Sequence, residues 1–218
     1  MRVSASGREL LDLLPGPGAG RTVVGVTGAP GAGKSTLARF LVDLLGDRGA
    51  HVPMDGFHLA DVELVRQGLL DRKGAPETFD ALGYAALLAR LVERPDHVVY
   101  APGFDRDLEQ PLAGAIAVPP TAEVVVTEGN YLLLDRPEWR EVRTRIDEVW
   151  HVRVDEPVRL VRLEARHRAF GKDPEQARAW VARVDEPNAR LVEASAGRAD
   201  RVLDLTEWRG TNTPGRGQ

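Results

Sequence analysis

The chain has 218 residues, of which 43% are hydrophobic and 28% charged, a balance typical of one globular domain. Its formal net charge of -4 provides no net basic field to attract a polyanion, so we expect no nucleic-acid partner. Cysteine is absent, which excludes disulfides, thiolate metal sites and cysteine nucleophiles.

Targeting signals are also missing from the sequence. No run of residues approaches the length of a membrane span, and the N-terminal stretch lacks the apolar core of a signal peptide. We therefore expect a cytoplasmic protein with no membrane partner. The sequence leaves its oligomeric state open, and a homodimer is one of the arrangements considered.

Strand and helix patterns alternate along the chain. Arg8–Leu14 has the pattern of a short helix, which the Pro- and Gly-rich run Pro15–Gly20 ends. The predicted strands are Thr22–Thr27, His51–Met54, His97–Tyr100, Glu123–Thr127, Glu148–Val154 and Arg201–Leu205. The predicted helices are Ser35–Leu45, Asp80–Glu93, Glu138–Ile146, Pro157–Phe170 and Pro174–Ala196. This order predicts an α/β fold with a mostly parallel sheet and helices on both faces.

A glycine-rich loop joins the first predicted strand to the helix that follows it. The residues Gly28-Ala29-Pro30-Gly31-Ala32-Gly33-Lys34-Ser35 match the P-loop pattern, G-x-x-x-x-G-K-[ST], in its required context of strand before and helix after. Glycines let backbone N–H groups point at phosphate oxygens, and the helix N-terminus adds positive potential. We expect Lys34 to reach the β- and γ-phosphates, Ser35 to bind Mg²⁺, and Thr36 to contact the α-phosphate.

A P-loop does not distinguish a hydrolase from a transferase. The guanine-selecting string Asn-Lys-x-Asp and the Ser-Gly-Gly signature of ABC-type ATPases are both missing. Asp55 lies at the carboxyl end of the second predicted strand, at the edge where open α/β sheets bind ligands. A carboxylate there can accept the proton of an attacking hydroxyl, although an Asp-Gly turn is the competing interpretation.

Four motifs together resemble a known group of proteins. GAPGAGKST, MDGFH, RKGAPETFD (Arg72–Asp80) and VVVTEGNYLLL (Val124–Leu134) are similar to the uridine kinase, pantothenate kinase and phosphoribulokinase group of P-loop kinases. The similarity is greatest to a bacterial branch described as nucleoside/nucleotide kinase-like or as sugar-transport kinases, and it runs from about Thr22 to Leu205. It implies a three-layer P-loop kinase fold with a five-stranded core sheet, ATP and Mg²⁺ as cofactors, and Asp55 as the catalytic base.

The same resemblance suggests further site residues. Glu128 matches the acidic residue that helps to hold Mg²⁺, with the capping of a turn as the alternative. A lid near residues 162–175 would close its arginines over the triphosphate, with Arg162 and Arg166 as the catalytic candidates. We expect Arg159, on the same helix face, to be solvent exposed. Arg198 matches the nucleotide-base edge and is placed over adenine, unless it is a structural arginine.

Two segments are expected to line the acceptor site. The candidate residues are Phe57, His58, Tyr100, Asp105, Arg106 and Asn188. Ala101 and Pro102 stand where pantothenate kinases carry polar residues, which argues against pantothenate. The Asp105 carboxylate suits the hydroxyls of a polyol, and the Arg106 guanidinium suits an anionic group. Alternatively, the two residues form an ion pair with each other. The four tryptophans, Trp208 included, are expected to serve in packing.

The resulting division of the chain is an N-terminal extension (1–20), one kinase domain (21–209) and a frayed tail (210–218). The leading functional hypothesis is a Mg²⁺- and ATP-dependent kinase that phosphorylates a hydroxyl of a small molecule, with a nucleoside or a sugar as acceptor. A pantothenate-like acid is the alternative acceptor. The rival from another class is a nucleotide-binding regulatory ATPase without a small-molecule acceptor.

Overall fold

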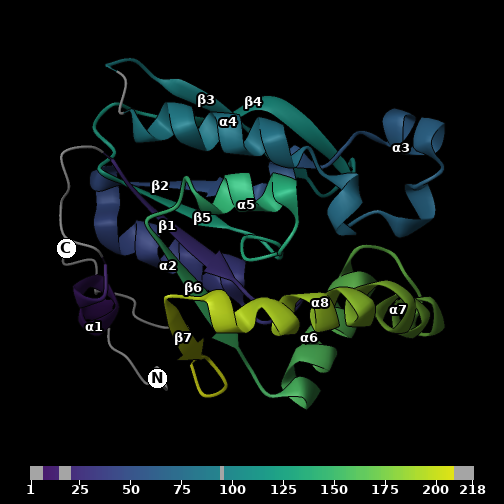
Figure 1. The fold of residues 1–218 in the computed structure, drawn as a ribbon. Helices are drawn as coiled ribbons and strands as arrows, with labels where there is room; N and C mark the ends of the chain where they lie inside the picture. The colour runs from purple at the N-terminus through teal and green to yellow at the C-terminus, as the bar shows by residue number, and fades with distance from the viewer. Residues whose placement is uncertain (1–6, 15–20, 94–95, 209–218) are drawn as a thin grey trace, which may run out of the picture.

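A computed structural model describes residues 7–14, 21–93 and 96–208 (Figure 1). Five parallel strands form its central sheet in the order β2-β5-β1-β6-β7. Their bounds are β1 Thr22–Thr27, β2 Gly49–Pro53, β5 Val124–Glu128, β6 Glu148–Arg153 and β7 Arg201–Asp204. The predicted five-stranded α/β fold is confirmed.

Helices cover both faces of this sheet, and the side chains of β1 alternate between the two resulting cores. Val23 belongs to the core shared with α4 (Ala81–Val92) and α5 (Pro137–Arg143). Val24 belongs to the opposite core, shared with α1 (Gly7–Asp12) and α2 (Lys34–Leu45). Strand side chains point to alternate faces, so a short buried strand between two apolar layers reads as a nearly continuous apolar run.

An antiparallel hairpin replaces one of the strands expected in the sheet. The predicted strand His97–Tyr100 is the beginning of β3 (Val99–Asp105), which pairs with β4 (Gln110–Val118) in a separate two-stranded sheet. β4 and the helix α3 (Asp61–Gln67) were not predicted. β4 contains three alanines and one glycine and is largely exposed, so its sequence lacks the alternation that identifies a half-buried strand.

The C-terminal helices form a group at the carboxyl ends of the strands, at the lower right in Figure 1. This group comprises α6 (Glu156–Ala169), α7 (Pro174–Trp180), a π-helical turn (Val181–Asp185) and α8 (Glu186–Ser195). The prediction of one helix over Pro174–Ala196 is therefore wrong in one respect, because a π turn separates α7 from α8. Pro187 has no N–H to donate to the carbonyl of Arg183, and the helix passes this point with wider π geometry.

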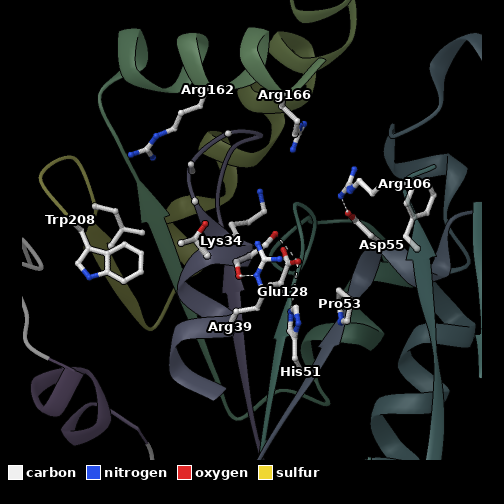
Figure 2. Close-up of a pocket in the computed structure, with 17 residues that line it drawn as sticks. Lys34, Arg39, His51, Pro53, Asp55, Arg106, Glu128, Arg162, Arg166 and Trp208 are labelled. Carbon is white, nitrogen blue, oxygen red and sulfur yellow. Dashed lines mark hydrogen bonds and ion pairs between the residues drawn. The ribbon is translucent and has the colours of Figure 1, made fainter. Parts of the chain in front are cut away.

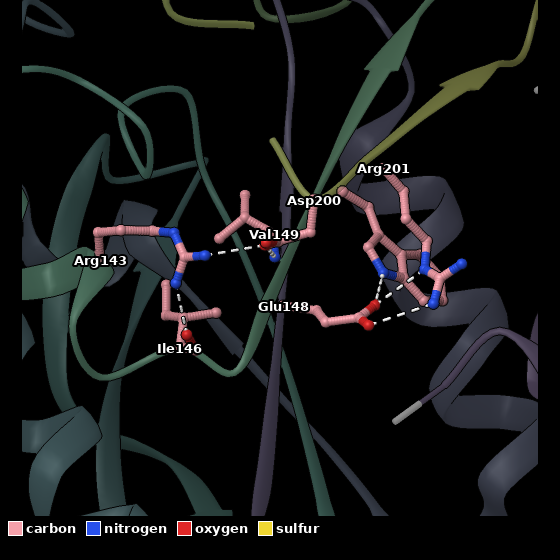
Figure 3. Close-up of polar contacts among 7 residues, drawn as sticks. Arg143, Ile146, Glu148, Val149, Asp200 and Arg201 are labelled. Atoms are coloured by element: carbon pink, nitrogen blue, oxygen red, sulfur yellow. Dashed lines mark hydrogen bonds and ion pairs between the residues drawn. The ribbon is translucent and has the colours of Figure 1, made fainter. Parts of the chain in front are cut away.

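Paired charges hold the start of β6 and β7, at the sheet edge away from the P-loop (Figure 3). Asp200 accepts hydrogen bonds from Arg143 Nη2 (2.8 Å) and from the backbone N–H of Val149 (2.7 Å). Arg201 donates to both carboxylate oxygens of Glu148, at 2.9 and 3.2 Å. Hydrogen bonding from Arg201 lowers the pKa of Glu148. These contacts fix the strands on which the functional edge is built.

The predicted extension and tail lie mostly outside the described residues. Residues 7–14 of the extension belong to the described part, and their helix α1 packs on α2. Within the described ranges, every helix is too short or too polar to serve as a membrane-spanning segment.

Candidate functional site

The P-loop, which joins β1 to α2, packs closely against the neighbouring strand β6. Gly28 lies so close to β6 that a Cβ atom on it would stand 2.3 Å from the carbonyl oxygen of Val152, so no other residue fits. Gly33 precedes α2 with a φ of 96°, a left-handed conformation that favours glycine. The free N–H groups at the start of α2 consequently face the loop, where an anion is stabilised.

Lys34 spans the inside of this loop. Its side chain is buried, and Nζ donates to the carbonyl oxygens of Gly28 (2.9 Å) and Ala29 (3.1 Å). Burial lowers the pKa of Lys34 to about 8, although the nearby Glu128 carboxylate acts in the opposite direction. A desolvated ammonium beside free N–H groups is suited to bind phosphate oxygens.

Ser35 and Glu128 offer two oxygens suited to a hard cation. Ser35 Oγ donates to Glu128 Oε1 across 2.9 Å, close to the ~3 Å between neighbouring ligands of an octahedral Mg²⁺. Burial raises the pKa of Glu128, and the Asp55 carboxylate raises it further, so a cation there would relieve an unfavourable charge. The described residues contain no group of three or more His, Asp or Glu able to hold a metal.

Asp55 lies just past the end of β2, in the 3₁₀ turn Met54–Phe57. Arg106 Nη2 donates to its Oδ2 across 2.7 Å. Burial raises the pKa of Asp55, but the positive charges of His58, which is protonated only in acid, and of Arg106 and Lys34 outweigh burial and lower it overall. Asp55 is therefore held as a carboxylate, the form in which it can accept a proton.

Two arginines of α6 point from above toward the P-loop (Figure 2). Arg162 lines the nucleotide side of the site, whereas Arg166 lies over the space between Lys34 and Asp55. The expected exposure of Arg159 is wrong, because this residue is buried and donates to Glu186 Oε1 at 2.5 Å. A Cβ on Gly31 would meet the carbonyl oxygen of Arg159 at 2.9 Å, so this stretch of α6 packs directly on the P-loop.

Two cavities meet at this point. The first, of about 890 Å³, follows the P-loop, and the second, of about 670 Å³, extends between the hairpin and the C-terminal helices. Seven residues line both cavities: Lys34, Ser35, Asp55, Phe104, Arg106, Glu128 and Arg166. The predicted phosphate, metal, base and lid residues therefore lie together where the cavities join.

Some of the predicted acceptor residues line the second cavity, and others do not. His58, Arg106 and Asn188 line it together with Asp55. Asn188 is buried, and its Nδ2 donates to the carbonyl oxygen of Gly74 at 3.3 Å. Asn188 thereby holds the loop that forms one wall.

Phe57, Tyr100 and Asp105 line neither of these two cavities. Phe57 packs on Tyr84, with ring centroids 4.8 Å apart, and Tyr100 is exposed on β3. The Asp105 carboxylate accepts from the backbone N–H groups of Asp107 and Leu108, both at 2.9 Å, and so shapes the hairpin turn. The ion pair considered between Asp105 and Arg106 is replaced by the pair of Arg106 with Asp55.

Arg198 does not line the nucleotide cavity where we expected it. It donates to the carbonyl oxygen of Leu133 (3.0 Å) and pairs with Asp135 (3.2 Å). Leu205 and Trp208, which follow β7, line that cavity instead. Trp208 packs edge-on against Phe40, with centroids 5.5 Å apart. The sequence signal was an aromatic residue just after the carboxyl end of a strand, the edge on which the other ligand groups lie.

Sequence reasoning singled out none of four polar residues of the second cavity, although Lys73 and Asp185 lie in the segments Arg72–Asp80 and Asp185–Arg190 that were expected near the acceptor. Lys73 Nζ donates to Asp61 Oδ1 at 2.6 Å, and His167 Nε2 lies 2.7 Å from Asp185 Oδ2. Asp61 begins the unpredicted helix α3 and Lys73 follows that helix, whereas Asp185 ends the π turn. No local motif marks these pairs, because their members are 12 and 18 residues apart.

Comparisons with known proteins identify relatives of this chain. A family model described as "Methylmalonyl Co-A mutase-associated GTPase MeaB" matches residues 2–55, a part of the chain that contains the P-loop. A protein of Schizosaccharomyces pombe named "Putative uridine kinase" is 34% identical over 194 residues, which cover 84% of this chain and 83% of that protein.

Two further relatives are similar to this chain. The pantothenate kinase of Streptomyces avermitilis is 32% identical over 129 residues, 57% of this chain and 39% of that protein. A crystal structure from Silicibacter sp. TM1040, titled "putative fructose transport system kinase", is 39% identical, has a TM-score of 0.81, and is matched over 90% of this chain and 96% of its own. This chain therefore belongs to the P-loop small-molecule kinases of the uridine kinase and pantothenate kinase group, and it is a phosphotransferase.

Proposed function

We propose that the protein transfers the γ-phosphate of ATP to a hydroxyl of a small molecule, and that a nucleoside or sugar-like compound is the acceptor. The observation that carries the proposal is the junction of the two cavities, where Lys34, Asp55 and Arg166 line both. A phosphoryl donor and an alcohol can approach each other only at such a junction. A regulatory ATPase needs the first cavity but has no use for the second.

The first cavity suits ATP. The free N–H groups at the start of α2 and the Lys34 ammonium would bind the β- and γ-phosphates. Arg162 lies above the P-loop, and Leu205 and Trp208 supply an apolar wall for the base. Ser35 and Glu128 would hold Mg²⁺, which when bound offsets the charge on the phosphate oxygens.

Asp55 would orient the acceptor hydroxyl and take its proton as the new P–O bond forms. Its depressed pKa keeps it ionised before transfer. Arg166 lies on the other side of the same junction and would neutralise charge on the transferring phosphoryl group. Because Arg162 and Arg166 both belong to α6, movement of that helix would carry both lid arginines with it.

A screen for phosphate transfer tests this proposal. Purified protein is incubated with Mg²⁺ and ATP labelled at the γ-phosphate, together with nucleosides, sugars or pantothenate, and labelled products are separated. We expect labelled phosphate to appear on at least one alcohol, and to disappear with Asp55→Asn. Release of free phosphate at a rate that no alcohol changes would instead support the regulatory ATPase.

A further inference from the structure

The second cavity contains charged side chains that are mostly neutralised in pairs. Arg106 pairs with Asp55 at 2.7 Å, Lys73 with Asp61 at 2.6 Å, and His167 with Asp185 at 2.7 Å. Lys73 also donates to the backbone carbonyl of Glu109 in the hairpin turn. An anionic group entering the cavity would have to displace a carboxylate from Arg106 or Lys73 before it could bind either cation.

Negative charge is also in excess there. Apart from Glu128 on the nucleotide side, five carboxylates are among the described residues that line the cavity: Asp55, Asp61, Asp71, Glu109 and Asp185. Apart from Lys34 and Arg166, which face the phosphates, three lysine or arginine side chains line it: Lys73, Arg106 and Lys172. Bound ATP adds further negative charge next to it, so the field at the acceptor opposes a second anion.

His58, which lines the cavity beside Asp55, can accept a hydrogen bond from a hydroxyl group. His58 Nδ1 lies 2.7 Å from the backbone carbonyl oxygen of Asp55, which can only accept, so Nδ1 carries the proton. Burial lowers the pKa of His58, and the neutral ring therefore retains Nε2 as a hydrogen-bond acceptor. The ring packs against Phe79 and Phe104, with centroids 4.0 and 4.7 Å away and the ring planes tilted by 42° and 47°, which restricts its orientation.

From this arrangement we propose that the acceptor is an uncharged compound with at least two neighbouring hydroxyl groups. One hydroxyl meets Asp55, and a second donates to His58 Nε2. The paired charges of the cavity select against alcohols that also carry a carboxylate or a phosphate. This inference rests on the proposed phosphoryl transfer and narrows its acceptor class to uncharged polyols, so that nucleotides, sugar phosphates and acids such as pantothenate are disfavoured.

Matched pairs of probes test the selection. Pantothenol and pantothenate, and glycerol and glycerate, differ only in a neutral CH₂OH group that replaces a carboxylate, and the other hydroxyls are the same. Phosphate transfer to each is measured, and so is equilibrium binding in the presence of Mg²⁺ and a non-hydrolysable ATP analogue. We expect the neutral member of a pair to have the higher kcat/KM and the tighter binding, by about tenfold for one unpaired charge.

The Lys73–Asp61 pair offers a sharper test within the chain. Asp61→Asn frees the Lys73 ammonium, and we expect the ratio of anionic to neutral acceptor affinity to rise by about tenfold. Asp71→Asn removes the same charge from the same cavity, but no ion pair involving Asp71 is found among the described residues, so the ratio should rise much less. Thermal unfolding of both variants checks that the fold is retained.

Binding separates this inference from the proposed function. Preference for the neutral probes in binding, without phosphate transfer to any of them, would support the cavity's selection and contradict the transferase. Transfer to an anionic probe in preference to its neutral partner would overturn the inference and leave the transferase intact. If Lys172→Gln then abolishes the preference for the anionic probe, Lys172 is the cation responsible. Its Nζ lies 4.8 Å from the centroid of the Trp180 ring, and it has no carboxylate partner among the described residues.

Discussion

Arg106 and Asp55 join the tip of the β3–β4 hairpin to the end of β2, through a hydrogen bond of 2.7 Å between Nη2 and Oδ2. The pair brings the unpredicted hairpin into the site. It also places a guanidinium beside the carboxylate that we propose as the base. Arg106 contacts the ring of Phe104 as well, 5.4 Å from its centroid, which restricts where the guanidinium can lie.

Removing this guanidinium should change the pH dependence of the reaction. The Arg106 charge lowers the pKa of Asp55, so in Arg106→Gln that pKa rises. Because Asp55 must be ionised to accept a proton, activity in the variant should be lost at a higher pH as the solution is acidified. The measurement is the acidic limb of kcat/KM against pH.

Arg140→Gln provides a matched control for this profile. Arg140, on α5, also pairs with a carboxylate, that of Asp135, but lines neither cavity. Its acidic limb should coincide with that of the unmodified protein. An unchanged limb in Arg106→Gln would show that the guanidinium does not act on the base.

Lys34 gives the nucleotide site a pH dependence on the alkaline side. Its pKa of about 8 lies below the ordinary value, and phosphate binding requires the charged form. Nucleotide affinity should therefore be constant below pH 8 and decline as the pH rises above that value. The measurement is the Kd of a non-hydrolysable ATP analogue across this range.

Two variants control the Lys34 experiment. Lys34→Arg stays charged throughout the range and should bind with no such decline. Lys34→Ala should bind weakly at every pH and lose about 3–4 kcal/mol of transition-state stabilisation with its fold intact. Full ATP turnover in Lys34→Ala would contradict the assignment of this loop to phosphate.

The two lid arginines should have separable effects. Arg166 lines both cavities, whereas Arg162 lines only the nucleotide cavity of the two. We expect Arg166→Ala to lower kcat by about three orders of magnitude, at the lower end of arginine contributions to phosphoryl transfer. Arg162→Ala should mainly raise the KM for ATP. Steady-state kinetics at saturating acceptor distinguish the two, and equal effects on kcat would contradict the assignment.

Trp208 should report on the bound base. Trp208→Ala removes the aromatic wall of the nucleotide cavity, and the KM for ATP should rise by about tenfold with little change in kcat. Nucleotide binding should quench tryptophan fluorescence in the unmodified protein and much less in Trp208→Phe. Trp180→Phe, on the acceptor side, is the control and should retain the quenching.

The fold was largely predictable because its signals are local. β1 was predicted at its observed bounds, since a buried parallel strand reads as an apolar run followed by the glycines of the P-loop. β4 and α3 were missed because their residues are mostly exposed, so burial does not impose a pattern on them. The π turn was missed because helical periodicity continues through it.

The site was predictable to the extent that its residues belong to one motif or one strand end. The P-loop, Asp55 and Glu128 converge because the carboxyl ends of parallel strands lie at one edge of a sheet. Arg198 was misplaced because it precedes β7, whereas the cavity forms after it at Leu205 and Trp208. Contacts such as Lys73 with Asp61 depend on how the elements pack, which sequence spacing does not reveal.

The central claim is that Asp55 serves the acceptor and not the nucleotide. Asp55→Asn keeps the size of the side chain but cannot take a proton, and we expect kcat to fall by about two to four orders of magnitude. Single-turnover transfer of labelled phosphate to an identified acceptor, measured beside equilibrium ATP binding, tests this directly. The account predicts that transfer is lost while ATP binds with nearly unchanged affinity. Lost ATP binding with an undiminished rate of transfer would place Asp55 on the nucleotide side and contradict the account.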